Sequence, residues 1–248
     1  MKRTALLPLF LICLAQAAGP GLGVQPTFAE HQVEPGGTVS GSFNVFTYRP
    51  PLKAQVELHD WRRNPDGHIE LLPPGSTPRS LAPWGRVGPL EINVPVAYET
   101  IRYRFKLPPS AAGSYHLALL IRPSSGAAKE LAGLRIQTRV SVLVPIYVVV
   151  RGTEAPRLSL IKTNEENDQY ELWVKNEGNV YLPVRIQVDA LDKEGKSLQA
   201  ETLFTGDMLP DEIITTRYTT KDLDPNALLL RFTVKAPGIT PLVWEALR

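Results

Sequence analysis

The stretch RIQTRVSVLVPIYVVVRG spans residues 135–152, and its pattern changes halfway along. In the first half apolar and polar side chains alternate, which is typical of a β-strand with one buried face. From residue 143 to residue 150 both faces are apolar around Pro145, so both faces must be covered. The sequence therefore raises the question of whether this chain or another molecule covers the second face.

The rest of the chain also indicates strands joined by turns. Its 23 prolines and 18 glycines are spread along the sequence, as expected where many short strands are connected. Within residues 101–107 apolar side chains alternate with basic ones, which favours an antiparallel sheet with one solvated face. We predict an all-β protein with two immunoglobulin-like β-sandwich domains in tandem. The stretch VQPTFAEHQVEPGG, from residue 24, is expected to form one opening strand that ends in a Pro-Gly-Gly turn at 35–37. Residues 73–89 are expected to form a long loop, and residues 124–133 a connection.

The first residues, MKRTALLPLFLICLAQAAG, have the three parts of a secretory signal peptide. Lys2 and Arg3 precede an apolar run of about ten residues, and an A-x-A cleavage signal follows. That run is too short to span a bilayer as a helix. We expect residues 1–17 to be removed after Sec export, so that the mature chain begins near Ala18.

Residues 151–158, RGTEAPRL, interrupt the series of expected strands. Glycine and proline within this stretch indicate a short hinge. We predict a larger sandwich over 18–150, a hinge over 151–156 and a smaller sandwich over 157–248.

Composition after cleavage excludes several classes of partner. Loss of Lys2 and Arg3 leaves 25 basic and 25 acidic residues, whereas a nucleic-acid partner would need a basic excess. The one cysteine, Cys13, lies in the leader, so no disulfide is expected. No later segment is long and apolar enough for stable membrane insertion. We expect a soluble protein in an extracytoplasmic compartment.

The sequence contains no recognisable catalytic or metal-binding motif. Its four histidines, His31, His59, His68 and His116, are isolated from one another and lack the spacing of a zinc site. In GTVSG, residues 37–41, the serine is displaced from the position of a hydrolase nucleophile. We expect no enzymatic activity, no metal and no cofactor.

Trp84 lies between Pro83 and Gly85 in the expected long loop. Loops carry binding residues but also need anchors. Two interpretations follow, a side chain that anchors the loop on the sandwich and a loop residue that contacts a ligand or partner.

Three stretches of the chain share one resemblance: VEPGGTVSGSFNVFTYR, YRFKLPPSAAGSYHLALLIRP and RVSVLVPIYVVVRG. They resemble the periplasmic pilus-assembly chaperones, the PapD-like family. The resemblance implies a periplasmic location, with the extracellular surface as the alternative. It also implies that pilus or surface-fibre subunits are the partners, and that a strand near residues 135–150 is donated to them. The implied contact residues are Ile136, Thr138, Val140, Val142 and Val144.

The sequence departs from the family at the group that anchors the subunit's C-terminal carboxylate. The family uses an arginine in the first strand and a lysine in the donor strand. Here the opening stretch VQPTFAE has no arginine, and Tyr147 falls where the lysine would be. The carboxylate anchor therefore cannot be carried over to this chain.

Two interpretations of residues 135–150 stay open. In the first, residues 136–144 complete a partner's groove by β-augmentation, and residues 146–150 are buried where the two sandwiches meet. In the second, the whole stretch is an ordinary last strand of its own domain. The alternative function is a structural or adhesive cell-envelope protein without chaperone activity. A carbohydrate-binding module would need a row of exposed aromatic residues, which the sequence does not have.

Overall fold

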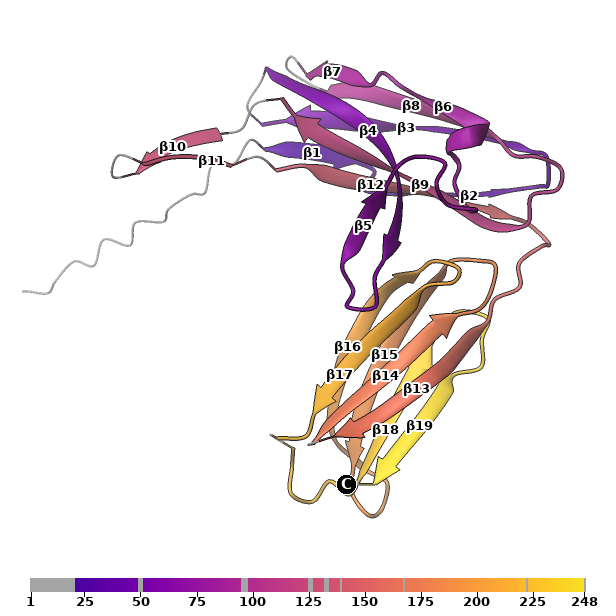
Figure 1. Ribbon diagram of the computed structural model, residues 1–248, viewed down its shortest axis with the longest axis vertical. Coiled ribbons are helices and arrows are strands. Elements are labelled where there is room, and N and C mark those ends of the chain that lie inside the picture. The colour runs from indigo at the N-terminus through magenta and orange to yellow at the C-terminus, as the bar shows by residue number, and fades with distance from the viewer. Residues whose placement is uncertain are drawn as a thin grey trace, which may run out of the picture.

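The computed structural model contains two β-sandwiches in tandem, and this confirms the predicted fold class (Figure 1). The first sandwich lies across the top of the view and the second descends from one end of it. The expected leader, residues 1–17, lies outside the described residues. The structure describes residues 21–48, 51–94, 98–124, 127–131, 134–138, 140–166, 168–221 and 223–247.

The first sandwich packs two sheets around one core. One sheet has the order β1 (Leu22–Gln25), β3 (Thr38–Thr47), β8 (Tyr98–Lys106) and β6 (Gly85–Gly88). The other has the order β2 (Ala29–Val33), β12 (Val142–Val150), β9 (Gly113–Pro123), β4 (Leu52–Arg63) and β5 (Ile69–Leu72), with β7 (Glu91–Val94) also paired to β4. Period-two alternation directs one face of each strand inward. Phe43, Ile101 and Phe105 are consequently fully buried.

The opening strand expected from the sequence is two strands in two sheets. β1 pairs antiparallel with β3, and β2 pairs parallel with β12. Pro26 separates them, and a proline has no N–H to give to a ladder. The chain therefore leaves one sheet at Pro26 and joins the other at Ala29.

Two segments expected to be irregular contain regular elements. The loop over 73–89 includes a 3₁₀ turn, Ala82–Trp84, and the edge strand β6. The connection over 124–133 includes β10 (Ala127–Leu131), which pairs with β11 (Leu134–Thr138). Composition did not indicate these strands because both are short, and pairing with a neighbouring strand decides whether such a segment is extended.

The second sandwich has a three-stranded and a four-stranded sheet. The first has the order β13 (Leu158–Glu166), β14 (Gln169–Asn176) and β17 (Ile213–Thr219). The second has the order β16 (Ser197–Met208), β15 (Leu182–Leu191), β18 (Leu229–Lys235) and β19 (Leu242–Leu247). Leu172, Ile186 and Phe232 are buried between the sheets.

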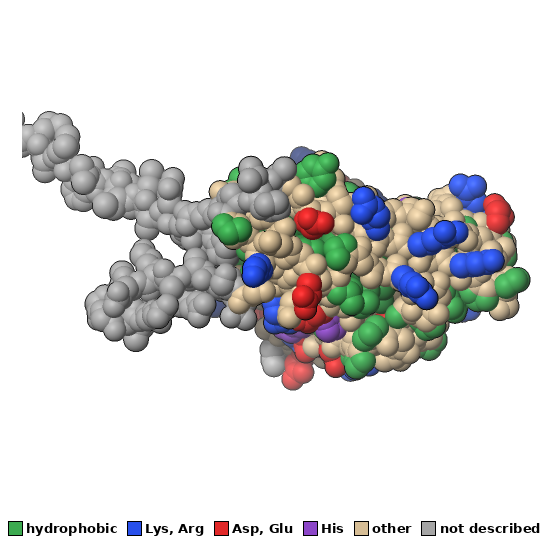
Figure 2. All heavy atoms as spheres, turned by 90° about the horizontal axis from the view of Figure 1, so that it is seen from above, with side chains coloured by type: hydrophobic (Ala, Val, Ile, Leu, Met, Phe, Trp, Pro, Cys, Tyr) green, Lys and Arg blue, Asp and Glu red, His purple; other side chains and the backbone are tan. Residues whose placement is uncertain are grey.

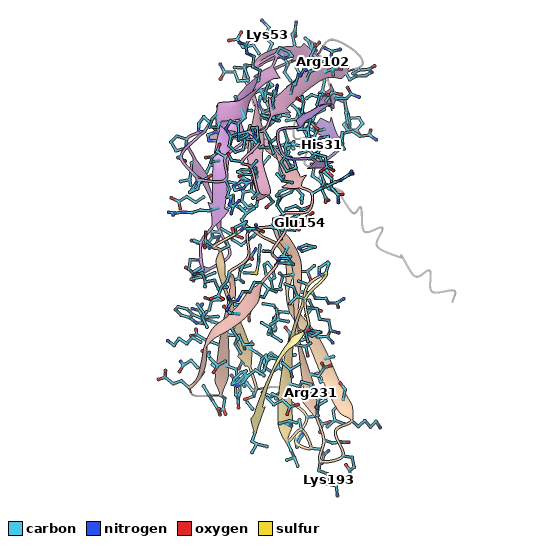
Figure 3. All side chains as sticks on the ribbon, turned by 90° about the vertical axis from the view of Figure 1, so that its right-hand side faces the viewer. His31, Lys53, Arg102, Glu154, Lys193 and Arg231 are labelled. Atoms are coloured by element: carbon cyan, nitrogen blue, oxygen red, sulfur yellow. The ribbon has the colours of Figure 1, made fainter. Side chains whose placement is uncertain are left out.

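Two sets of hydrogen bonds join the sandwiches where β12 passes into β13. At the start of β9, the Gly113 N–H donates to Thr153 Oγ1 at 2.8 Å, and the Ser114 N–H donates to the Asn179 carbonyl at 2.8 Å. The tip of the β4–β5 hairpin reaches the second sandwich, where the Thr215 N–H donates to the Pro65 carbonyl at 3.0 Å. In Figure 3 Glu154 lies at this junction, between Arg102 at one end of the molecule and Lys193 at the other.

A buried carboxylate strengthens the hairpin contact. Glu212 accepts backbone hydrogen bonds from Leu209, at 2.7 Å, and from Arg63 of the first sandwich. Burial raises the pKa of Glu212. Its carboxylate oxygens therefore satisfy N–H groups from both domains at one point.

Candidate functional site

The first half of β12 is an edge of its sheet. β9 pairs with β12 along the whole of Val142–Val150, but β2 pairs only with Ile146–Val150. Among the described strands, none covers the outer side of residues 142–145. The parallel ladder with β2 begins directly after Pro145. Four residues of backbone are therefore open to an incoming strand.

A hairpin extends from this edge and away from the sandwich (Figure 1). Its strands β10 and β11 pair with each other alone, with Ile136 opposite Lys129 and Thr138 opposite Ala127. Two of the expected contact positions, Ile136 and Thr138, thus lie on a projecting strand. The long strand expected over 135–150 is divided between β11, which ends at Thr138, and β12, which begins at Val142.

The other three expected contact residues differ steeply in exposure. Val140 is 47% exposed, and Val142 is half-buried against the core of the first sandwich. Val144 is 0% exposed within that core. Exposure on this face is lost within four residues, so Val144 belongs to the scaffold rather than to a free surface.

Residues 146–150 divide between two environments. Ile146, Val148 and Val150 are buried in the first sandwich's own core. On the opposite face, Tyr147 packs with Trp61 and Leu209, and Val149 lies in the core cluster of the second sandwich. One face of this segment is therefore covered at the domain junction.

A pocket of about 500 Å³ lies at the end of the open edge, between the two sandwiches. Tyr147 from β12 and Tyr181 from the second sandwich stack within it, with ring centroids 4.4 Å apart. The Tyr147 hydroxyl donates to Asp207 at 3.3 Å. The pocket is lined by Thr27, Phe28, Glu30, Pro145, Tyr147, Tyr181, Pro183 and Asp207.

The charges of this pocket disfavour an anion. Its lining includes two carboxylates, Glu30 and Asp207, and no lysine, arginine or histidine. Burial raises the pKa of both phenols, Tyr147 and Tyr181, and raises the pKa of Asp207. The tyrosines are thus neutral hydrogen-bond donors to carboxylates. The position at which the resemblance implies a lysine is a buried tyrosine bound to an acidic residue.

Trp84 packs against the first sandwich. It ends the 3₁₀ turn, is half-buried against the core, and meets the Tyr115 ring edge to face at 4.6 Å. The segment that carries it is further fixed by Asp60, which is fully buried and accepts from Ser80 Oγ at 2.6 Å. These contacts match a side chain that anchors its segment.

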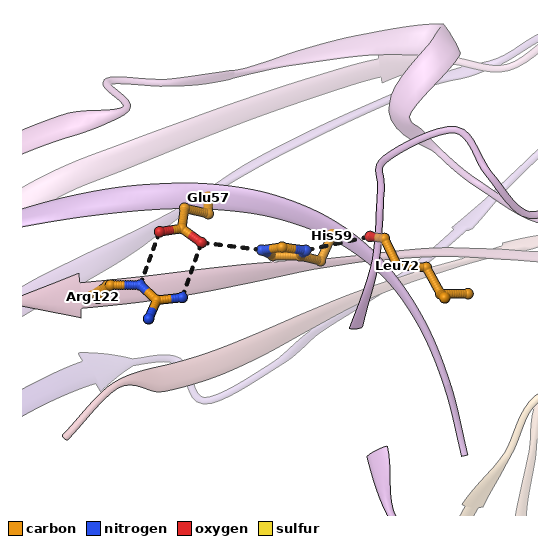
Figure 4. Close-up of polar contacts among 4 residues, drawn as sticks. All are labelled: Glu57, His59, Leu72 and Arg122. Atoms are coloured by element: carbon orange, nitrogen blue, oxygen red, sulfur yellow. Dashed lines mark hydrogen bonds and ion pairs between the residues drawn. The ribbon is translucent and has the colours of Figure 1, made fainter. Parts of the chain in front are cut away.

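No group of three metal-ligating side chains converges in the described part of the chain. His116 is buried, and its Nε2 donates to the Trp61 carbonyl at 3.2 Å. Burial lowers the pKa of His116 to about 4, so this ring is neutral at neutral pH. His59 lies 3.3 Å from Glu57, which also accepts two hydrogen bonds from Arg122 (Figure 4). Both histidines have structural partners.

The sequence does not indicate the second half of the pocket. Tyr181 directly precedes β15 and Asp207 lies in β16, so both belong to the second sandwich, and Asp207 is 60 residues from Tyr147 along the chain. No local pattern could have joined them, because sequence periodicity reports a strand's faces and not which strands of another domain lie opposite. No helix within the described ranges is long and apolar enough to cross a membrane.

No protein-family model and no curated protein sequence matches this chain. Solved structures do match its architecture. The class 5 fimbriae chaperone CfaA is 9% identical, with a TM-score of 0.50 over 92% of this chain and 100% of its own. A chain from the chaperone–tip adhesin complex of CFA/I fimbriae is 11% identical, with a TM-score of 0.50 over 91% of this chain and 98% of its own. The chain therefore has the two-sandwich fold found in the fimbrial chaperones.

Proposed function

We propose that the protein is a periplasmic chaperone that binds pilus or surface-fibre subunits by lending them a β-strand. The observation that carries this proposal is the open edge at Val142–Pro145, which continues toward the projecting β10–β11 hairpin. The match to fimbrial chaperones supports it at the level of fold. Binding of protein subunits, without catalysis, is the activity that such an edge can provide.

The physical basis is β-augmentation. Backbone groups along an open edge form a ladder with the added strand, and alternate side chains fill pockets of the partner. An open edge also invites aggregation, which proteins limit with short edges and prolines. Here the open part of β12 is four residues long and ends at Pro145. An edge of this length can pair with one added strand and is too short for extensive edge-to-edge aggregation.

The contact residues of the proposal are Ile136, Thr138 and Val140, with Val142 as a half-buried last contact. Val144 is the point where the strand becomes core. The acidic and aromatic pocket lies beyond this point, at Pro145. We infer that a subunit's C-terminal carboxylate is not anchored there, because Glu30 and Asp207 would repel it.

We expect the Val140→Asp variant to remain folded and to lose its subunits. Val140 is 47% exposed, so a carboxylate there costs little stability, but a partner's apolar groove would have to desolvate it. The measurement is co-purification of subunits from periplasm with the wild-type protein and the variant. Val243→Asp is the matched control, because Val243 is 54% exposed on the second sandwich.

Three outcomes of that experiment are informative. A 1:1 complex with a small β-rich subunit that survives Val243→Asp and not Val140→Asp supports the proposal. Equal loss in both variants would contradict it, since the effect would then be one of charge. Self-association of the wild-type protein without any subunit would favour a structural or adhesive envelope protein.

We also propose that the two sandwiches fold independently, with the boundary at 151–156. β13–β19 form two sheets without strands from the first sandwich, and Val149 is the one residue of that sandwich in their two core clusters. A fragment of residues 157–248 should therefore give a β-sheet circular dichroism spectrum and unfold cooperatively. Its melting temperature should be lower than in the full chain, because Val149 and Trp61 no longer cover its end. A random-coil spectrum would reject the boundary.

A further inference from the structure

A basic surface covers one end of the β1–β3–β8–β6 sheet. This sheet is the one that does not contain the open edge of β12. Arg102 and Arg104 point outward from β8, and Arg86 points outward from the neighbouring β6. Together with backbone and short side chains of β3, they line a hollow of about 570 Å³. Figure 2 shows lysine and arginine side chains gathered at this end of the first sandwich. We call Arg86, Arg102, Arg104 and Lys106 the basic face.

The cations of the basic face lack acidic partners. Within the described residues, none of the four forms an ion pair, and the positions beside them on β3 are Thr38, Ser40 and Ser42. Several arginines elsewhere form ion pairs, as Arg122 does with Glu57 in the other sheet (Figure 4). Among the described residues, Arg63 and Arg79 form none and instead donate hydrogen bonds to backbone carbonyls. The basic face therefore differs in that its cations without ion pairs lie together on two adjacent strands.

The register adds repulsion to this arrangement. Arg86 and Arg104 are direct cross-strand partners, and like charges directly opposite one another destabilise a sheet. A serine or glutamate at position 86 would avoid the repulsion without loss of solubility. A pair that opposes folding points to a ligand that neutralises it.

We propose that the basic face binds an extended acidic segment of a protein partner, with carboxylates at alternate positions. Arg102, Arg104 and Lys106 recur at every second residue of one strand, about 6.7 Å apart. An extended segment presents its own alternate side chains at the same spacing. The guanidinium fork matches a carboxylate with two parallel hydrogen bonds.

The shape of the hollow favours a single chain over a lipid surface. It extends across β3, β8 and β6, a width of roughly 10 Å for three adjacent strands, which accommodates one extended chain. Ser40 and Ser42 form its floor and are exposed, so their hydroxyls are additional donors. A flat membrane would contact the arginine tips and leave this floor uncovered. The site lies on the opposite sheet from β12 and is independent of the proposed strand donation.

The test uses the mature chain and labelled synthetic peptides in a fluorescence anisotropy titration. One peptide alternates Glu with Thr, and the other has the same composition with its Glu residues in one block. Low ionic strength is used because salt screens exposed charges. The test variant carries Arg86→Gln, Arg102→Gln and Arg104→Gln. The control variant, with the same change in net charge on the second sandwich, carries Lys196→Gln, Lys221→Gln and Lys235→Gln.

We expect the alternating peptide to bind more tightly than the block peptide. Its affinity should fall about tenfold or more in the arginine variant, and by no more than about twofold in the lysine control. The arginine variant should melt at or above the wild-type temperature, because it loses a repulsive pair.

Four results would overturn the proposal. Equal affinity for both peptides, or an equal loss of affinity in both variants, would mean that net charge alone accounts for the binding. If neither peptide binds the wild-type chain, the basic face is not a binding site for acidic segments. Binding to phosphatidylglycerol vesicles and not to phosphatidylcholine vesicles, lost in the arginine variant and without peptide binding, would assign the surface to a membrane.

Discussion

The Val144→Asp variant is expected to leave the first sandwich unfolded, although the same substitution four residues earlier is tolerated. Val144 is 0% exposed among the core residues of that sandwich. An unpaired carboxylate there should cost more than about 4 kcal/mol of the free energy of unfolding. Val140→Asp should change it by no more than about 0.5 kcal/mol, as is usual for exposed positions. Urea unfolding of the two variants measures the difference.

A milder pair of substitutions allows the same comparison of stability if the Val144→Asp variant does not express. Val144→Thr conserves shape and buries a hydroxyl, which should cost about 1–3 kcal/mol where no partner is available. Val140→Thr is the matched exposed control. Equal stability of the two threonine variants would mean that β12 is not core at residue 144, and the donated segment would then extend further toward Pro145.

The Gly113→Ala variant is expected to loosen the junction between the sandwiches. The backbone of Gly113 is left-handed, with φ 76°. A Cβ at this position would overlap the Asn179 carbonyl of the second sandwich. The left-handed backbone alone costs alanine about 1–2 kcal/mol. With the overlap added, the loss should reach about 3 kcal/mol, or a melting temperature lower by roughly 6–12 °C.

Gly152→Ala separates these two contributions. Gly152 has φ 74°, and nothing lies within 4 Å of a Cβ built on it. It should therefore show the backbone cost without the steric one. If both alanine variants lose the same stability in differential scanning calorimetry, Gly113 does not contact Asn179 closely, and the junction is looser than the structure indicates.

The sequence alone determined the class of fold, because strand periodicity is a local property. Alternation in residues 101–107 and 135–142 indicated half-buried strands, and the break near Gly152 indicated two units. Local pattern did not indicate β6 or β10, whose glycine- or alanine-containing segments are extended because a neighbouring strand pairs with them. Local pattern also indicated a single opening strand, although the two halves of this segment pair in different sheets.

Only the tertiary structure decided what the strands do. Val140 and Val144 share a side-chain type and a face in the sequence, yet one is exposed and the other fully buried, because burial depends on which strands lie alongside. Tyr147 meets Tyr181 and Asp207 only where the two sandwiches come together. Arg86 lies opposite Arg104 only because β6 pairs with β8. The tyrosine pocket and the arginine pair each join residues from separate segments, and their proximity is set by packing and register rather than by local pattern.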